Sequence, residues 1–488
     1  MTAMTDNITE TINTDAVYRY RQLACIVMEA AAPIAVGSGE KSIMTDAAVA
    51  RDANGLPYIP GSSLAGIIRH AMKSHTDRKK WMGCQEGLKV MGSRLAVTEA
   101  KILDSNGKPA DGLLPDAAED PLLCHFMANR LPIRQHVRIS HFGTAKDMGK
   151  FDEEVVPKGT RFCFELELLA DEDKESGRIM DDILRSIAAD TFRIGSGTRS
   201  GFGAMEIVSI GRRKIDLMIK DDRDAYLKKS SMLNPDWDGF MQIDPKQLKS
   251  TDDGFIRYTL TLKPADFMFF GSGFGSDDAD MTYVRNPAVL WSPDGRKGTF
   301  SDAAEEKFIL IPASSVKGAL SHRIAYYYNQ LTGVFADDRK MFPEISPDEL
   351  KELLSKHTGD RNHAVKTLFG SAGDNGDEKA RGLTIFTDVT AKNTAGAKSK
   401  ILNHVSVDRF TGGAINGALF KEETFFARGT EFETTILVSE DAVANDKEKD
   451  KVLKAFEYAL TDICNGLLPL GGGVNRGNGT FKGSWKKE

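Results

Sequence analysis

Two distant stretches of the chain share one pattern, and this internal repeat limits the fold more than any other feature of the sequence. The segment "IPGSSLAGIIRHAM", residues 59–72, returns in altered form as "IPASSVKGALSHRI", residues 311–324. In both copies a turn delivers serine to the start of a segment whose apolar residues recur at helical spacing. A repeat of this kind indicates two related domains, each with the same strand, turn and helix.

Three further pairs of segments occur in the same order in both halves. They are an apolar run ending in Gly-Ser-Gly (25–39 and 258–273), two strands around a polar, glycine-containing excursion (136–168 and 404–438), and a glycine-rich loop before a last strand (194–207 and 470–483). Strands and helices therefore alternate in each copy as in a ferredoxin-like α+β core that carries large insertions. We expect a short disordered lead at 1–17, a first domain at 18–214, a connector at 215–253 and a second domain at 254–488.

Composition excludes several classes of protein. The 488 residues carry a net charge of −6, 41% are hydrophobic, and no apolar run is long enough for a membrane helix. The five cysteines form no CxxC pair, which argues against a disulfide framework. The first residues lack the basic and apolar regions of a signal peptide. We therefore expect a cytoplasmic protein without a membrane partner.

The paired glycine-rich loops do not fit a nucleotide-cofactor site. "GSGTRSGFG" and "GGGVNRGNG" are both one residue longer than the dinucleotide fingerprint, and neither contains the Gly-Lys-Ser/Thr of a P-loop. Glycine does allow backbone N–H groups to approach a phosphodiester, and each loop holds an arginine. The candidate RNA-binding residues are Gly195, Gly197, Arg199 and Gly201 in the first loop and Gly471, Gly473, Arg476 and Gly477 in the second. The alternative is that the glycines only form tight connections between strands.

The starts of the two repeated helices are candidate anion sites, because unpaired N–H groups and the helix dipole favour a phosphate there. The residues concerned are Gly61, Ser62 and Ser63 in the first copy and Ser314 and Ser315 in the second, with Arg69 and Lys317 as nearby cations. Serine acting only as a helix cap is the alternative.

The two polar excursions carry apolar and basic residues suited to unpaired bases and phosphates. Phe142, Met148, Phe410 and Leu419 could stack on bases, with core packing as the alternative for each. The basic residues that we expect to contact RNA here are Arg134, Arg138, His404 and Arg409.

Several of these motifs together resemble a known family. "IPGSSLAG" preceded by "GSG…TDAAVARD", then "RFTGGAINGALFKEE" and "GSGTRSGFG", are similar to the RAMP superfamily of CRISPR-associated proteins, and within it to the backbone subunits of type III (Csm and Cmr) effector complexes. The resemblance covers nearly the whole chain. It implies a modified RNA-recognition (ferredoxin-like) fold in each half, a β-hairpin thumb that wedges between nucleotides, and assembly with other effector subunits along a guide CRISPR RNA.

The resemblance also implies cleavage of single-stranded target RNA by an aspartate between the first strand and the "PGSS" helix. Asp46 stands in that place, and Mg²⁺ or another divalent cation would assist it. In the second half an ungapped count from the glycines puts Asp280 there, whereas matching "RNPAV" to "DAAVA" puts Arg285 there. We prefer the second alignment because it keeps the apolar run in register, and on it the second half binds RNA without cutting.

Three alternatives stay open. The chain could be an RNA-binding scaffold without catalysis, with Asp46 as an ordinary loop residue. It could be a RAMP endoribonuclease that processes precursor guide RNA through His70, His136 or His404. A structural zinc ion is a further, weaker alternative, because its candidate ligands match no standard finger spacing; they are His70, His75, Cys84, Cys124 and His125.

Overall fold

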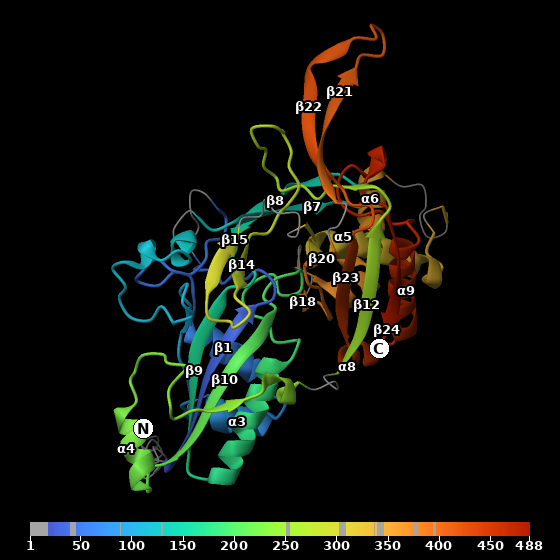
Figure 1. Cartoon of the computed structure of the whole chain (residues 1–488). Coiled ribbons are helices and arrows are strands. Elements are labelled where there is room, and N and C mark those ends of the chain that lie inside the picture. Colours follow the sequence, from blue (N-terminus) through green and yellow to red (C-terminus); the bar gives the residue numbers. More distant parts are fainter. Residues whose placement is uncertain are drawn as a thin grey trace, which may run out of the picture.

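The protein is described by a computed structural model that covers residues 18–39, 45–87, 89–127, 130–249, 254–301, 309–335, 337–338, 346–371, 373, 379–393 and 397–488. The predicted disordered lead, residues 1–17, lies outside the described residues, and so does the end of the predicted connector, 250–253. Figure 1 shows two domains side by side, with the first half of the chain in blue to green and the second mostly in orange and red.

The first domain is built on an antiparallel sheet with its first strand at the centre. β1 (Tyr20–Ala30) pairs with β10 (Met205–Asp216) on one side and with β9 (Arg161–Ala170) on the other. β9 then pairs with β5 (Leu95–Val97) and β6 (Ala100–Ile102). The spatial order β10-β1-β9-β6 is that of a ferredoxin-like sheet.

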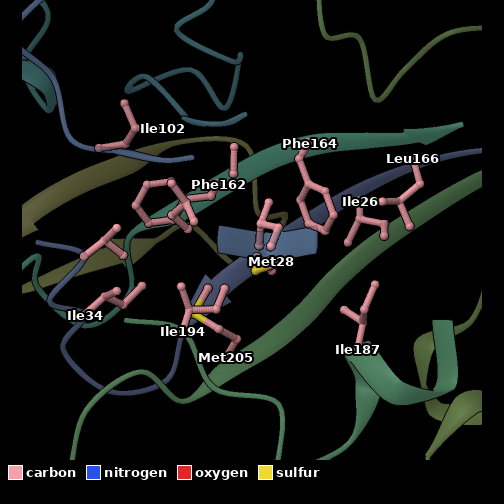
Figure 2. Close-up of a cluster of buried hydrophobic side chains, with 14 of the residues drawn as sticks. Ile26, Met28, Ile34, Ile102, Phe162, Phe164, Leu166, Ile187, Ile194 and Met205 are labelled. Carbon is pink, nitrogen blue, oxygen red and sulfur yellow. The ribbon is translucent and has the colours of Figure 1, made fainter. Parts of the chain in front are cut away.

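One face of this sheet is covered by α1 (Gly61–Ala71) and α3 (Asp173–Ala188). Alternate residues of the strands point at these helices, and Figure 2 shows Ile26 of β1, Leu166 of β9 and Ile187 of α3 in one buried cluster. Burial of such side chains is the main term that holds the sheet and the helices together.

The other face of the first sheet is covered by the segment that we predicted to be a connector. Leu233 and Phe240 pack on Cys25 and Cys163, and β11 (Met241–Ile243) pairs with β10. Burial on both faces explains why the middle of β1 is a continuous apolar run instead of an alternating one. The segment is therefore part of the first domain's packing as well as a link to the second.

The second domain repeats the arrangement. β12 (Phe255–Pro264) pairs with β24 (Phe481–Lys487) and β23 (Glu431–Ser439), and β23 pairs with β20 (Val389–Asn393). The order β24-β12-β23-β20 is again ferredoxin-like, and α5 (Ala313–Thr332) and α9 (Lys449–Cys464) are the helices of this domain.

Each domain carries one long β-hairpin between the second and third strands of its core. The first thumb is β7 (Ile133–Ile139) with β8 (Ala145–Glu154), and the second thumb is β21 (Lys398–Val407) with β22 (Ala414–Phe426). In Figure 1 the first thumb runs toward α5 of the second domain, whereas the second thumb projects away from the body of the protein.

The remaining elements are short. The helices are α2 (His75–Met82), α4 (Lys220–Lys228), α6 (Pro347–Ser355), α7 (His363–Phe369) and α8 (Glu440–Ala444). The strands are β2 (Tyr58–Ile59), β3 (Cys84–Glu86), β4 (Lys89–Met91), β13 (Phe267–Met268), β14 (Ala288–Trp291), β15 (Gly298–Ser301), β16 (Leu310–Ile311), β17 (Gly370–Ser371), β18 (Ala380–Arg381) and β19 (Thr384–Ile385).

The α+β class and the tandem ferredoxin-like domains predicted from the sequence are confirmed by this topology. Within the described part of the chain, no helix combines the length and the hydropathy needed to cross a membrane.

Candidate nucleic-acid interface

Asp46 lies at the base of the first thumb, in the loop that precedes α1. Its backbone N–H donates to Asp152 Oδ1 at 2.8 Å, and the N–H of Asp152 donates back to Asp46 Oδ2 at 3.2 Å. A parallel bridge between Ala47 and Glu153 continues the contact. The exposed Asp46 carboxylate is therefore held against the thumb by two reciprocal hydrogen bonds.

Asp280 lies at the base of the second thumb in the same way. Asp280 Oδ2 accepts the N–H of Lys421 at 2.8 Å, and a parallel bridge joins Met281 to Glu422. Like Asp46, Asp280 is exposed. The two aspartates differ in one neighbour, because Lys421 stands where the first domain has Asp152.

These contacts correct the register that we preferred for the second half. The bridges Gly37–Val49 and Gly271–Tyr283 are equivalent in the two domains, which makes Asp280 the counterpart of Asp46. Arg285 is instead the counterpart of Arg51. The apolar run after Arg285 misled the alignment because it belongs to β14, in a hairpin that the first domain lacks.

The counterpart arginines fix the aspartate loops to the thumbs. Arg51 Nη2 lies 2.7 Å from Glu154 Oε1, while Glu154 Oε2 accepts the N–H of Val49. Arg285 Nη2 lies 2.8 Å from Glu423 Oε1 in the second domain. Sequence reasoning missed these carboxylates, although the paired "DEEV" and "KEET" stretches that contain them were visible in the repeat.

A buried glutamate stands next to each of these pairs on the thumb. Glu422 is fully buried between Arg476 of the second glycine loop and His404, whose Nε2 lies 3.8 Å away. In the first domain His136 Nε2 lies 3.1 Å from Glu153 Oε1. Arg476 thus joins the second thumb to the glycine loop, whereas His404 contacts Glu422 within the thumb; both residues were predicted to bind RNA.

The thumbs display the apolar residues that the sequence singled out. Met148 is 102% exposed and Phe410 is 99% exposed, and Phe142 and Leu419 are also exposed. Met148 has a left-handed backbone, with φ of 52°, at the position where the second thumb has Gly417. Such a conformation costs a side-chain-bearing residue about 1–2 kcal/mol, and strain of this kind is often kept for function.

Arg138 and Arg409 are exposed on the thumbs beside these apolar residues. Two-stranded ribbons with apolar residues facing solvent are unusual surfaces for a protein to leave uncovered. With adjacent arginines, they have the composition of a surface on which bases stack and phosphates are neutralised.

The start of α1 is open to solvent, with Ser62 exposed and Gly61 and Ser63 half-buried. Arg69 does not reach it. Its Nη1 donates to the carbonyl oxygens of Met82 and Gly83, at 3.0 and 2.7 Å, because Arg69 lies in the last turn of α1 beside the end of α2.

The start of α5 is occupied by a side chain of the same domain. The N–H of Ala313 donates to Asp388 Oδ1 at 2.8 Å, so the anion at this helix start is a carboxylate. Ser314 and Ser315 are half-buried there. Arg134 of the first thumb also reaches Asp388, with Nη2 3.1 Å from Oδ2.

The glycine loops have equivalent backbones but different surroundings. A Cβ at Gly195 would overlap the carbonyl oxygen of Ala35, and one at Gly471 would overlap that of Phe269, so both glycines are needed for close packing. All the glycines of the two loops that were predicted to bind RNA have positive φ; they are Gly195, Gly197, Gly201, Gly471, Gly473 and Gly477. The first loop is docked on the second domain through a bridge from Gly201 to Thr387, and the second faces open space at Gly477.

Arg199 and Lys317 were predicted as RNA-binding residues in different halves of the chain, and they come together where the first glycine loop meets α5. Burial, with a smaller contribution from the neighbouring Arg381, lowers the pKa of Arg199 to about 10. Burial lowers the pKa of Lys317 to about 8, with Arg199 adding to the effect. Three clustered cations repel one another, and a phosphate would relieve that repulsion.

A cleft of about 370 Å³ lies between the first thumb and the Asp280 loop. Its walls include Pro132 and Arg134 of the first domain and Phe274, Tyr283 and Arg285 of the second. The aromatic and basic lining would suit an unstacked base.

The chemistry around Asp46 fits one kind of metal better than another. Mg²⁺ is usually held by one or two carboxylates with waters and substrate phosphates, and Asp46 and Asp152 provide two carboxylates at one point. In the described residues no group of three or more His, Cys, Asp or Glu side chains is placed to hold a metal, and the five proposed zinc ligands are among the residues described. His70 instead contacts Arg381, and His125 stacks on Phe300.

These observations define a class of protein: two fused ferredoxin-like domains, each with a thumb, a glycine-rich loop and an aspartate loop. A family model for the RAMP superfamily matches residues 27–206 and 301–482, one match in each domain. The chain belongs to the RAMP superfamily, and this membership indicates a CRISPR-associated, RNA-binding role. A search among curated proteins found no match.

Proposed function

We propose that the chain is a guide-RNA-binding backbone subunit of a type III CRISPR effector that positions complementary target RNA and cleaves it at an aspartate loop. The proposal rests on one observation above all. Asp46 and Asp280 lie at equivalent points, each hydrogen-bonded to the backbone of a thumb that exposes apolar and basic residues. A repeated unit of this kind is suited to gripping a single strand at regular intervals.

Cleavage would proceed by attack of a 2′-hydroxyl on the adjacent phosphorus. The 2′-oxygen–phosphorus bond forms, the bond to the 5′-oxygen breaks, and the proton of the hydroxyl ends on that leaving oxygen. Asp46 would orient the hydroxyl, and Asp152 fixes Asp46 for this task. A bound divalent cation would supply neutralisation of the charge on the phosphate. The products would carry a 2′,3′-cyclic phosphate and a 5′-hydroxyl.

The two aspartate loops are expected to differ in activity. Lys421 replaces Asp152 on the second thumb, so a residue that ends in an ammonium group stands at the position from which the first thumb adds a carboxylate to the Asp46 site. The ammonium group disfavours a divalent cation through charge repulsion. We therefore propose the main cut at Asp46 and a weaker or silent site at Asp280.

The test is cleavage of labelled target RNA by the complex reconstituted with its guide and Mg²⁺. Asp46→Ala is expected to lower the rate of one cut at least a hundredfold, which corresponds to a loss of about 2.7 kcal/mol of transition-state stabilisation. Asp278→Ala, an exposed change in the loop of Asp280, is the matched control and should leave every cut intact.

Binding of the target must be measured on the same variants. Unchanged binding with a lost cut supports catalysis by Asp46. Unchanged cleavage in Asp46→Ala, Asp280→Ala and the double variant would instead identify the chain as a scaffold. Cleavage of precursor guide RNA by the isolated chain without divalent metal would favour the processing endoribonuclease, with His136 and His404 as the residues to test.

A further inference from the structure

A row of tyrosine rings lies on the surface of the second domain, where the last turns of α5 pack against α9. The ring centroids of Tyr326 and Tyr327 are 5.2 Å apart, and those of Tyr327 and Tyr458 are also 5.2 Å apart. The Tyr327 hydroxyl donates to Asp462 Oδ2 at 2.8 Å, which fixes the middle ring. Tyr326 is 58% exposed and Tyr458 is 39% exposed, so the two outer rings face solvent.

A cation stands at each end of this row. The Arg323 guanidinium lies over the Tyr326 ring, 5.9 Å from its centroid, and Lys454 Nζ lies over the Tyr458 ring at 5.6 Å. Arg323 Nη2 also donates to the Leu467 carbonyl oxygen at 2.9 Å, and Leu467 is 62% exposed. We call Arg323, Tyr326, Lys454, Tyr458 and Leu467 the α5–α9 patch. Figure 1 shows α9 on the side of the second domain that is away from the first domain.

The uncompensated charge at the α5–α9 patch is positive. Arg323 Nη1 lies 3.2 Å from the buried carboxylate of Asp462, and Lys451 Nζ lies 2.7 Å from Glu448 Oε2. Lys454 is exposed, and within the described part of the chain no carboxylate is paired with it. The patch therefore offers a free ammonium group beside solvent-facing rings.

The first domain does not repeat the patch. α3 and α9 have the same length, and the offset that matches the two glycine loops also matches Tyr458 to Asp182 and Lys454 to Arg178. Arg178 pairs with Asp182 at 3.0 Å and reaches Asp77 of α2 at 3.2 Å. At this place the first domain thus has ion pairs and a separate short helix, whereas α5 continues as one helix of 20 residues. Because the thumbs and glycine loops occur in both domains, the patch has a role that these elements do not share.

We propose that the α5–α9 patch is the docking surface for another protein, whose contacting segment combines apolar side chains with carboxylates. The apolar side chains cover Tyr326, Tyr458 and Leu467, and a carboxylate pairs with Lys454. Tyrosine and arginine are the side chains that most often carry binding energy at protein interfaces. Charge complementarity to Lys454 selects an acidic partner. The inference rests on contacts within the second domain and does not depend on RNA cleavage.

Two other occupants fit the patch less well. A single strand of RNA binds by stacking bases on ring faces, but each exposed ring here has another ring on one side and a cation over its face. A second copy of the chain is disfavoured because both ends of the row are cationic. In a two-fold contact Arg323 would meet either Arg323 or Lys454 of the other copy, and like charges repel.

The test is photo-crosslinking from the patch in cells of the source organism, which supply the natural partners. The full chain carries Tyr326→p-benzoylphenylalanine, and the adducts formed on irradiation are identified by mass spectrometry. We expect an adduct with one protein, at a segment that contains apolar residues and aspartate or glutamate. The matched control is Asp182→p-benzoylphenylalanine, at the first-domain counterpart of Tyr458, which should not give an adduct with that segment.

A charge exchange then tests the contact itself. Lys454→Glu should lower the adduct yield roughly tenfold, because it sets two carboxylates against each other. Replacing the contacted carboxylate of the partner by lysine should restore the yield. Lys482→Glu, an equal change of charge at an exposed position of β24, should leave the yield unchanged.

Three results would overturn the proposal. The first is an adduct formed mainly with RNA or with a second copy of the chain. The second is the absence of any adduct from a variant that keeps the wild-type circular dichroism spectrum. The third is a protein adduct whose yield Lys454→Glu does not change, because the contact would then not depend on charge. Tyr326 and Lys454 are both exposed, so these substitutions leave the core of the domain intact.

Discussion

Replacing Arg134 by leucine should uncouple the two domains. Leucine is the residue that the second thumb has at the equivalent position, Leu402. The Arg134 side chain is 6% exposed and that of Asp388 is 3% exposed, so the change leaves a carboxylate buried without its cation. Breaking a buried ion pair on one side costs about 3–5 kcal/mol. Asp388 keeps its bond from the Ala313 N–H, which places the expected loss at the lower end, about 3 kcal/mol.

The assay is urea unfolding of Arg134→Leu, Asp388→Asn and the double variant, monitored by fluorescence, because Trp291 lies in the junction. The double variant should lose less than the two single losses added together, since neither charge is then left alone. A double variant whose loss equals that total within about 0.5 kcal/mol would refute the reasoning, because it would mean that the two residues do not interact.

Three further predictions concern single side chains. Met148→Gly should raise the free energy of unfolding by about 0.5–1 kcal/mol, because glycine accepts the left-handed backbone, and it should weaken RNA binding in a filter assay; a loss of stability would contradict the first part. Lys317→Met should lower the slope of log affinity for RNA against log salt by about 1. Because the folded pKa of Lys317, about 8, is below its unfolded value, wild-type stability should rise between about pH 8 and 10.5, and this rise should be absent in the variant. Burial and the neighbouring His141 and Lys146 lower the pKa of His322, so the folded state disfavours the charged form of this side chain. The wild type should therefore lose stability as the pH falls below about 6.5. Urea midpoints of the wild type and of His322→Gln that fall equally over this range would contradict the prediction.

The repeat predicted the fold well because the local signals in both halves agree. The serine turns, the apolar strands and the glycine pairs each indicate the same β-α-β order, and Gly195 and Gly471 occupy the equivalent close contacts that the repeat implies. The serine turns and the apolar strands depend on residues that are near one another in the sequence. The glycine contacts with Ala35 and Phe269 join distant residues and were implied by the repeat alone.

The details of the site depend on contacts between distant residues, and these were not predictable. The bond from Asp152 to Asp46 joins residues more than a hundred positions apart, and Arg134 meets Asp388 only because the domains pack together. Arg69 was assigned to a phosphate on its charge, whereas carbonyl groups at the end of α2 bind it. The register of Asp280 failed for a related reason, since an inserted hairpin supplied apolar residues that resembled a strand of the first half.

The inserted β14–β15 hairpin also sets the order in which the parts of the protein can finish folding. Val289 of β14 is buried in the core of the first domain, its N–H donates to the Lys158 carbonyl, and Phe300 packs against the same core. During synthesis, therefore, the last apolar surface of the first domain is covered only after residue 301 has left the ribosome. A chain cut between the two repeats would leave that surface in water. The fused gene thus ties the folding of the first domain to the presence of the second.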